Sequence, residues 1–226
     1  MTAQPSTAKA PKTTAAKEPK AGAIRVANRQ RIIAAAEEEF VRSGFDGATI
    51  QAIADRAALP KANVHYYFQN KATLYAAVLD NIVELWNSQF STISAADDPA
   101  TALDAWIREK VRLAFTYPNA SKLFALEVLR GAPLLQGHIH GTLRDWARGR
   151  AAVIQAWIDQ GRLRACDPMQ LIFLIWSSTQ YYADSDTQIL ALTDQPKYTA
   201  EMQAQIADFL SHTLLAGCGL TAPAQN

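Results

Sequence analysis

Apolar residues recur along most of this chain at spacings of three and four positions, the period of an amphipathic α-helix. Ile33, Ala36 and Phe40 form one such stripe. No segment alternates apolar and polar residues as a half-buried strand does, so the chain is predicted to be all-α. The stripes and the Gly, Pro and Asp residues between them predict about nine helices, near residues 25–43, 50–57, 61–68, 70–90, 100–116, 119–130, 139–160, 168–184 and 198–216.

The stretch 49–71 has the pattern of a helix-turn-helix. A short helix is followed by the turn Ala58-Leu59-Pro60 and a second helix of only two turns, 61–68. Proline has a fixed φ and no N–H to donate, so Pro60 belongs at the start of that second helix. A two-turn helix is not stable alone, so we expect Val64 and Phe68 to hold it against the core.

The predicted solvent face of the second helix carries side chains that suit DNA. An Asn amide can bond adenine at two points, Lys can reach guanine or phosphate, and Ala permits close approach to a base. Tyr hydroxyls, and a Lys near a helix N-terminus, suit phosphate oxygens. The alternative is an ordinary helical hairpin with solvated polar groups, which explains poorly the aromatic and His side chains crowded on so short a helix. The candidates are Lys61, Ala62, Asn63, His65, Tyr66, Tyr67 and Lys71.

Charge is distributed unevenly along a chain whose net charge is only +1, a value that argues against a histone-like wrapper. Residues 1–31 contain seven bases and one acid, whereas residues 32–226 contain 15 bases and 20 acids. Residues 1–23 lack an apolar stripe and are predicted to be a disordered basic tail. The tail either solubilises the protein or follows DNA phosphates, and its composition fits both roles.

Several other functions find no support in the chain. Cys166 and Cys218 lie far apart and suggest neither a disulfide framework nor a zinc site. His138 and His140 have no third metal ligand nearby and are interpreted as a surface loop. There is no catalytic constellation or phosphate-binding loop, and the longest apolar run, 171–176, is too short for a membrane. We therefore expect a cytoplasmic, non-enzymatic protein that uses no cofactor and no metal.

Residues 25–75 resemble the DNA-binding domain of TetR-family regulators, with a short recognition helix followed by Tyr-Phe and a Lys that opens the next helix. The resemblance implies a homodimer on double-stranded DNA, with a helix-turn-helix domain at 24–70, a ligand-binding and dimerisation domain at 71–217, and a C-terminal tail at 218–226. It also implies DNA contacts from the residues at the family's contact positions, namely Thr49, Lys61, Asn63, His65, Tyr66, Tyr67 and Lys71.

The turn departs from the family pattern at two positions. Ala58 stands where the family usually has Gly, and Pro60 stands where a Ser usually caps the recognition helix. Either departure could shift the recognition helix, so base-level contacts cannot be carried over directly from the family.

The second half of the chain also resembles members of this family. The segments 116–135 and 171–184 are similar to those of regulators of pyrimidine utilisation. This resemblance implies that the effector is uracil, thymine or a similar small heterocycle.

Three residues of the helix at 168–184 are spaced to line one of its faces. Trp176, Gln180 and Asp184 follow one another at four-residue intervals. Trp offers a stacking surface, Gln matches a donor–acceptor edge of uracil, and Asp184 could accept from a ring N–H. Trp86 is expected to close the pocket. The alternative is that Trp176 belongs to the core and Gln180 is a satisfied buried amide.

The last two long helices, 168–184 and 198–216, are expected to form the dimer as a four-helix bundle, using apolar residues such as Ile172, Ile175 and Phe209. The resulting hypothesis is a repressor that binds a palindromic operator and responds to a pyrimidine. Two alternatives stay open. One is a TetR-family regulator of another pathway with a different small ligand, and the other is an architectural DNA-binding protein without an effector.

Overall fold

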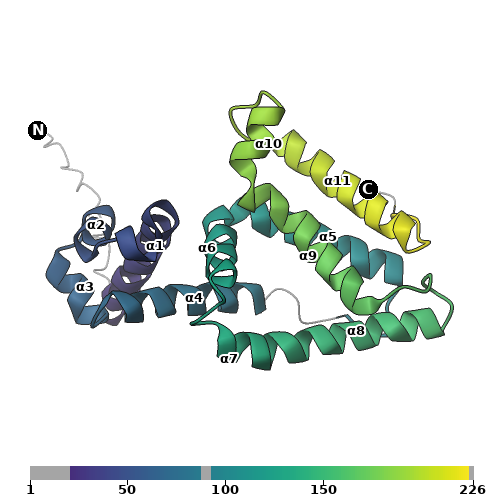
Figure 1. Cartoon of the computed structure of the whole chain (residues 1–226), viewed down its shortest axis with the longest axis horizontal. Helices are drawn as coiled ribbons and strands as arrows, with labels where there is room; N and C mark the ends of the chain where they lie inside the picture. Colours follow the sequence, from purple (N-terminus) through teal and green to yellow (C-terminus); the bar gives the residue numbers. More distant parts are fainter. Residues whose placement is uncertain (1–20, 88–92, 224–226) are drawn as a thin grey trace, which may run out of the picture.

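The computed structural model describes residues 21–87 and 93–223. These residues form α-helices and one π-helical segment and contain no strand, which confirms the all-α prediction (Figure 1). The predicted tail lies almost wholly outside the described residues, as does the end of the helix expected at 70–90. The helices are α1 (Ala21–Gly47), α2 (Ile50–Arg56), α3 (Lys61–Tyr67), α4 (Lys71–Asn87), α5 (Pro99–Thr116), α6 (Pro118–Leu129), α7 (Gln136–His138), the π-helix η1 (Ile139–Leu143), α8 (Arg144–Asp159), α9 (Pro168–Asp184), α10 (Asp186–Leu192) and α11 (Ala200–Gly217).

The helices α1, α2 and α3 gather at one end of the molecule, and α4 leads from them toward the remaining helices (Figure 1). We call α1, α2 and α3 together the head. Its core contains the stripe predicted on α1, with Ile33, Ala36 and Phe40 all buried. Gly44 breaks the helical geometry of α1 with a φ of 68°, a conformation that Gly adopts without steric cost. The chain therefore turns into α2 where the sequence predicts a stop.

Side-chain caps set the starts of α4, α5, α9 and α11. Asn70 Oδ1 accepts from the Thr73 N–H at 2.9 Å before α4. Asp98 and Asp167 cap α5 and α9 in the same way, and each precedes a Pro at the first helical position. These caps explain why helix starts were well predicted from sequence.

A second core lies between α5, α8, α9 and α11 and includes Leu103, Ile107, Ile154 and Trp157. The helix α9 contacts α5, α6, α8 and α11, so it occupies the centre of this part of the molecule, which we call the body. Among residues 21–87 and 93–223, no helix is both long and apolar enough to cross a membrane.

Two features differ from the prediction. The segment of His138 and His140 was expected to be a loop but is helical, because α7 and η1 run directly into α8. The π-helical turn accommodates Gly141, whose φ and ψ are both near −110°. The short helix α10 was not predicted, since its residues are all at least partly exposed and leave no clear stripe.

The residues proposed for the dimer face of α9 are also placed differently. Ile172 and Ile175 are fully buried within the protomer, as part of its own second core. The apolar residues that α9 exposes are Phe173, Leu174 and Tyr181. An apolar stripe identifies a buried face but not whether the same chain or a partner covers it.

Candidate DNA-reading surface and effector cavity

The helix-turn-helix is held in shape by local hydrogen bonds. Thr49 Oγ1 accepts from the Ala52 N–H at 3.1 Å and caps α2. The turn after α2 places Ala58 in the left-handed region, with φ of 50°. Arg31 reaches across from α1 and donates to the Ala57 and Ala58 carbonyls at 2.7 and 3.3 Å, so the carbonyls at the end of α2 are satisfied.

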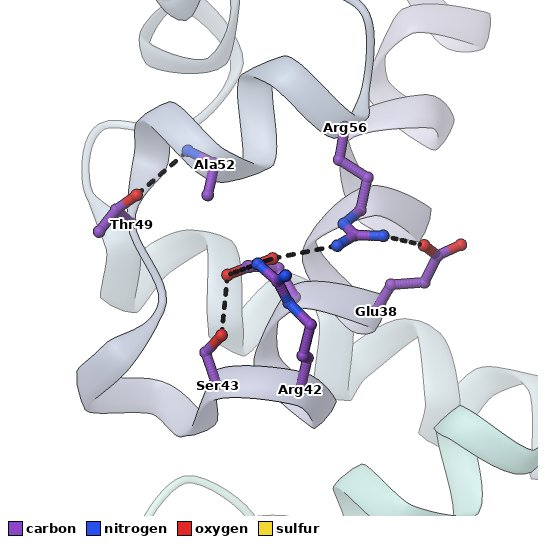
Figure 2. A network of polar contacts seen from close by, with 7 residues as sticks. Glu38, Arg42, Ser43, Thr49, Ala52 and Arg56 are labelled. Atoms are coloured by element: carbon purple, nitrogen blue, oxygen red, sulfur yellow. Dashed lines mark hydrogen bonds and ion pairs between the residues drawn. The ribbon is translucent and has the colours of Figure 1, made fainter.

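A buried carboxylate ties α2 to α1 (Figure 2). Glu39 is 2% exposed and accepts from Arg42, Ser43 and Arg56 at 2.8, 2.9 and 3.3 Å. These hydrogen bonds, led by the one from Arg42, lower the pKa of Glu39 although burial opposes the shift. Arg56 also pairs with Glu38 at 2.8 Å. The orientation of α2, and of the turn that follows it, is thus fixed by charge as well as by packing.

The helix α3 presents most of the predicted DNA-contacting side chains outward. Lys61, Ala62, His65 and Tyr66 are exposed, and Tyr66 is 69% exposed. Val64 and Phe68 are buried beneath them, as the sequence predicts. In addition, Asn63 is half-buried, as is Tyr67, which packs on the head core. The exposed polar face of α3 is therefore free to contact base edges in a groove of DNA.

Two arginines that sequence reasoning counted only as part of a basic region lie beside this helix. Arg25 lies over the Tyr66 ring at 5.9 Å, and Arg29 lies over the Phe68 ring at 5.5 Å. Both arginines are exposed. The start of α1 thus adds positive charge next to the recognition helix, where it can meet phosphates. Their charge was visible in the sequence, but their position over α3 was not.

Lys71 is placed differently from the other candidates. Its Nζ donates to the Asp46 and Ala48 carbonyls at 3.1 and 3.0 Å and lies 4.8 Å from the Phe45 ring centroid. The side chain therefore joins the start of α4 to the loop before α2. An ammonium has three N–H donors, so one further contact to phosphate is compatible with this arrangement.

A cavity of about 70 Å³ lies in the body, close to α4. It brings together three of the four predicted ligand residues, Trp86, Trp176 and Gln180. The remaining lining residues, which sequence reasoning missed, are Lys110, Phe124, Leu143 and Trp146. Since one water needs roughly 10–15 Å³, the cavity corresponds to about five to seven waters, a size that suits a small ring.

Aromatic contacts give the cavity its walls. Trp146 stacks on Trp176 with ring centroids 5.8 Å apart and an interplanar angle of 23°. Trp86 meets Phe124 edge-on at 4.6 Å. Flat, apolar walls favour a planar ligand. Apart from the three tryptophans, the polar side chains of the lining are Gln180 and Lys110.

Lys110 is an unusual member of this lining, because it is only 7% exposed and its ammonium lies 5.4 Å from the Trp86 ring centroid. Burial lowers the pKa of Lys110 to about 8, and attraction to Asp184 partly opposes that shift. The cavity therefore places a cation at its wall in a poorly solvated setting.

Asp184 does not line the cavity, unlike the other three predicted ligand residues. Its Oδ1 accepts from Ser121 Oγ at 2.7 Å, which joins the end of α9 to α6. Desolvation raises the pKa of Asp184, and Ser121 and Lys110 act in the opposite direction. Asp184 therefore lies outside the lining and attracts Lys110, which is part of it.

A larger, open groove of about 590 Å³ lies beside the cavity and shares Trp146 with it. Its carboxylates are already engaged, since Asp98 accepts from Thr101 at 2.9 Å and Glu109 pairs with Arg112 at 2.7 Å. The smaller cavity, with aromatic walls and convergent polar groups, is the better candidate for a specific effector site.

The helix α6 links the cavity to the head. Phe124 lines the cavity, and Glu127, one turn later, accepts a buried hydrogen bond from Tyr75 Oη at 3.0 Å. The Tyr75 ring packs edge-on against Phe40 at 4.8 Å in the head core. Burial and the bond to Glu127 raise the pKa of Tyr75, so its hydroxyl stays protonated.

Among residues 21–87 and 93–223 there is no group of three His, Cys, Asp or Glu side chains arranged to hold an ion. The His138–His140 pair, considered above for metal, therefore has no third ligand in this part of the chain.

Two family models match the chain. Residues 32–78 match the family described as bacterial regulatory proteins, tetR family, and residues 79–221 match the C-terminal region of YcdC-like proteins. Together the two models cover nearly all of the described residues.

Curated relatives include the HTH-type transcriptional regulator RutR of Escherichia coli strain K12, which is 39% identical over 167 residues, 74% of this chain and 79% of that one. The HTH-type transcriptional repressor SCO4008 of Streptomyces coelicolor is 30% identical over 128 residues, 56% of this chain and 63% of that one. Both relatives are transcriptional regulators and neither is described as an enzyme.

Solved structures agree on the fold. The transcriptional regulator SCO4942 from Streptomyces coelicolor matches with a TM-score of 0.63 and 26% identity, covering 82% of this chain and 97% of that one. AibR in complex with isovaleryl coenzyme A and operator DNA matches with a TM-score of 0.63 and 18% identity, covering 87% of this chain and all of that one.

Proposed function

This chain belongs to the TetR family of bacterial regulatory proteins, and we propose that it is a repressor that binds a palindromic operator as a homodimer and releases it on binding uracil or thymine. The family assignment gives a transcriptional regulator with a helix-turn-helix. The palindromic operator, the homodimer and the pyrimidine effector go beyond this family assignment and are proposed here.

The observation that carries the proposal is the position of the cavity. Its lining combines Gln180 and Trp176 from α9 with Trp86 from α4, the helix that leads to the head. A small effector in the cavity contacts both the centre of the body and this connecting helix. A ligand bound there can therefore favour one arrangement of the head over another.

The chemistry of the lining supports a pyrimidine. The Gln180 amide offers a coplanar donor and acceptor, which match the N3–H and O4 edge of uracil. The aromatic walls suit a flat ring. The size of about 70 Å³ favours a single ring over an extended ligand such as an acyl coenzyme A. The resemblance of segments 116–135 and 171–184 to pyrimidine-utilisation regulators points to the same ligand class.

At the other end, α3 supplies the DNA-contacting surface. We assign base contacts to Lys61, Ala62 and Asn63 and phosphate contacts to Thr49, Tyr66 and Tyr67, with His65 on the same exposed surface. Arg25 and Arg29 add phosphate contacts from α1. Two such heads related by a twofold axis read the two halves of a palindrome.

Repression then follows from differential affinity. The effector must bind the arrangement that does not fit the operator more tightly than the one that does, because equal affinity shifts nothing. For example, a 100-fold preference between the two arrangements corresponds to about 2.7 kcal/mol of coupling.

The test is a calorimetric and thermal-shift panel of pyrimidines and purines on the full chain, followed by operator binding with and without each ligand. We expect uracil and thymine to bind and to weaken operator affinity at least about tenfold. Gln180→Ala removes the amide and should abolish the ligand response while leaving operator affinity in place. Gln170→Ala, on the exposed surface of the same helix, is the matched control and should keep the full response.

Three results would contradict the proposal. Operator affinity unchanged by uracil and thymine at millimolar concentration overturns pyrimidine sensing. A full response in Gln180→Ala overturns the assignment of the cavity. If no small molecule in the panel stabilises the protein and DNA binding shows little sequence preference, the chain is an architectural protein without an effector.

A further inference from the structure

The selectivity of the cavity cannot come from most of its lining. Indole rings stack on any planar heterocycle, whatever its substituents. The Gln180 amide has a donor and an acceptor that exchange places when the amide rotates by half a turn, so it can pair with either polarity of ligand edge. These groups select a flat, polar ring but do not distinguish an oxo group from an amino group.

Lys110 differs from them because an ammonium has three N–H donors and no acceptor. The side chain lines the cavity, is 7% exposed and lies 5.4 Å from the Trp86 ring centroid. Asp184 lies near enough to attract the ammonium and is itself held by Ser121 at 2.7 Å. Below the Lys110 pKa of about 8, and therefore in titrations at pH 7 or lower, the group at this wall is mainly an ammonium, which donates and does not accept.

We propose that Lys110 is the specificity-determining residue of the cavity and selects heterocycles with an exocyclic oxygen over those with an exocyclic amino group at the same position. The inference rests on the proposed function, in which this cavity binds the effector. An oxo group accepts a charge-assisted hydrogen bond from Lys110. An amino group meets it donor to donor and leaves buried polar groups unpaired, which polar sites reject strongly.

The test compares uracil with cytosine, which carries an amino group where uracil carries O4. Isothermal titration of the full chain should give the wild type a preference for uracil of at least about 100-fold. In Lys110→Met the donor is lost, so uracil binding weakens and the preference falls below about tenfold. In Lys110→Gln the amide can rotate to accept, so cytosine binding increases relative to the wild type. Melting curves establish that each variant is folded.

Lys122→Met is the matched control. Lys122 pairs with Asp186 at 2.7 Å and does not line the cavity, so its removal should leave the preference unchanged. A uracil preference that stays as large in both Lys110 variants as in the wild type overturns the inference and leaves pyrimidine sensing intact.

A second ligand pair separates this inference from the proposed function. Hypoxanthine and adenine differ in the same way, by an oxo and an amino group on one ring position. If the wild type binds hypoxanthine but no pyrimidine, and Lys110→Gln removes its discrimination against adenine, the pyrimidine effector is wrong and the role of Lys110 holds. If neither pair binds, both proposals fall.

Discussion

In the turn between α2 and α3, Ala58 adopts the left-handed backbone conformation, with φ of 50°. In that region Cβ crowds the following carbonyl, at a cost of roughly 1–2 kcal/mol that Gly avoids. The turn requires this conformation, since the Leu59 N–H bonds back to the Ala54 carbonyl at 3.1 Å. The family's usual Gly is thus explained, and this chain keeps the turn despite the strain.

Replacing Ala58 by Gly should therefore stabilise the protein. Relief of the strain outweighs the entropy that Gly adds to the unfolded chain, and we expect a gain of about 0.5–1 kcal/mol. Urea unfolding followed by circular dichroism measures it. Ala58→Val, which is β-branched and more crowded at positive φ, should be less stable than wild type. A less stable Gly variant would mean that the turn is not left-handed.

Glu39 is the second residue with a defined energetic role. Its folded pKa is lowered, so its contribution to stability is fully present above the ordinary value of 4.5 and is lost as the pH falls through the lower folded value. Glu39→Gln keeps the shape of the side chain but removes its negative charge, so Arg42 and Arg56 no longer have an anionic partner at this position. We expect a loss of about 1.5–3 kcal/mol at pH 7, measured by urea unfolding.

The pH dependence makes this prediction specific. The difference in free energy of unfolding between wild type and Glu39→Gln should be constant near neutral pH. It should shrink as the pH falls below 4.5, because the wild-type carboxyl becomes protonated. Glu38→Gln is the control, since the Glu38 side chain is half exposed and its pair with Arg56 should contribute less than about 1 kcal/mol. Equal losses of stability in Glu39→Gln and Glu38→Gln would contradict the role assigned to the buried carboxylate.

At the scale of helices, caps and periodicity account for what the sequence predicts. Asn70 and the Asp-Pro pair at Asp98 mark helix starts by local chemistry, and the structure shows both caps. The short helix α10 has no such stripe and was missed. Local signals suffice for α5, α9 and α11 because each has a side-chain cap and its own apolar stripe.

The lining of the cavity is only partly predictable from local sequence spacing. Trp176 and Gln180 are one turn apart on α9, so periodicity places them together. Asp184 is eight residues from Trp176, which is about 80° further round the helix, and this rotation carries it out of the lining and toward Ser121. Lys110 comes from α5, and no spacing rule predicts which distant helices meet.

Signal transfer between helices can be tested at the bond from Tyr75 to Glu127, which joins α4 to α6. Tyr75→Phe removes the hydroxyl and leaves one Glu127 oxygen without that donor, which should cost about 1–3 kcal/mol. We also expect the effector to weaken operator binding less than in wild type, because α6 holds both Phe124 at the cavity and Glu127 at the head. Operator titrations with and without uracil measure the ratio of the two operator affinities.

Tyr198→Phe controls for the loss of a tyrosine hydroxyl. Its hydroxyl donates to the Tyr182 carbonyl at 3.2 Å, within the body and away from the head. This variant should keep the wild-type ratio of operator affinities. If Tyr75→Phe also keeps that ratio, the bond stabilises the protein without carrying the signal.

For the whole molecule, the homodimer proposed above needs a contact surface, and α9 and α11 are the helices that expose apolar side chains suited to one. Phe173, Leu174 and Tyr181 on α9 are each close to half exposed, and Phe209 on α11 is 62% exposed. Large apolar side chains exposed on two helices that contact each other are typical of a protein–protein contact. We propose this surface, rather than the buried residues Ile172 and Ile175, as the dimer face.

Phe209→Glu should therefore weaken dimerisation. A charge placed in an apolar interface must be desolvated without a partner, in both copies at once, so we expect the dimer dissociation constant to rise at least about tenfold, or 1.4 kcal/mol. Sedimentation equilibrium measures this constant. Operator affinity should fall at the same protein concentrations, because a monomer contacts only one half of the palindrome.

Leu129→Glu distinguishes loss of the interface from loss of surface apolarity. Leu129 is 83% exposed and is the last residue of α6, a helix that is separate from α11 in Figure 1, so its substitution changes the surface but not the proposed contact. It should leave the dimer intact and the operator affinity unchanged. If Leu129→Glu dissociates the dimer and Phe209→Glu does not, the two copies meet along α6. The spacing of the heads would then be set by the same helix that reaches the cavity, and effector binding would alter the dimer itself.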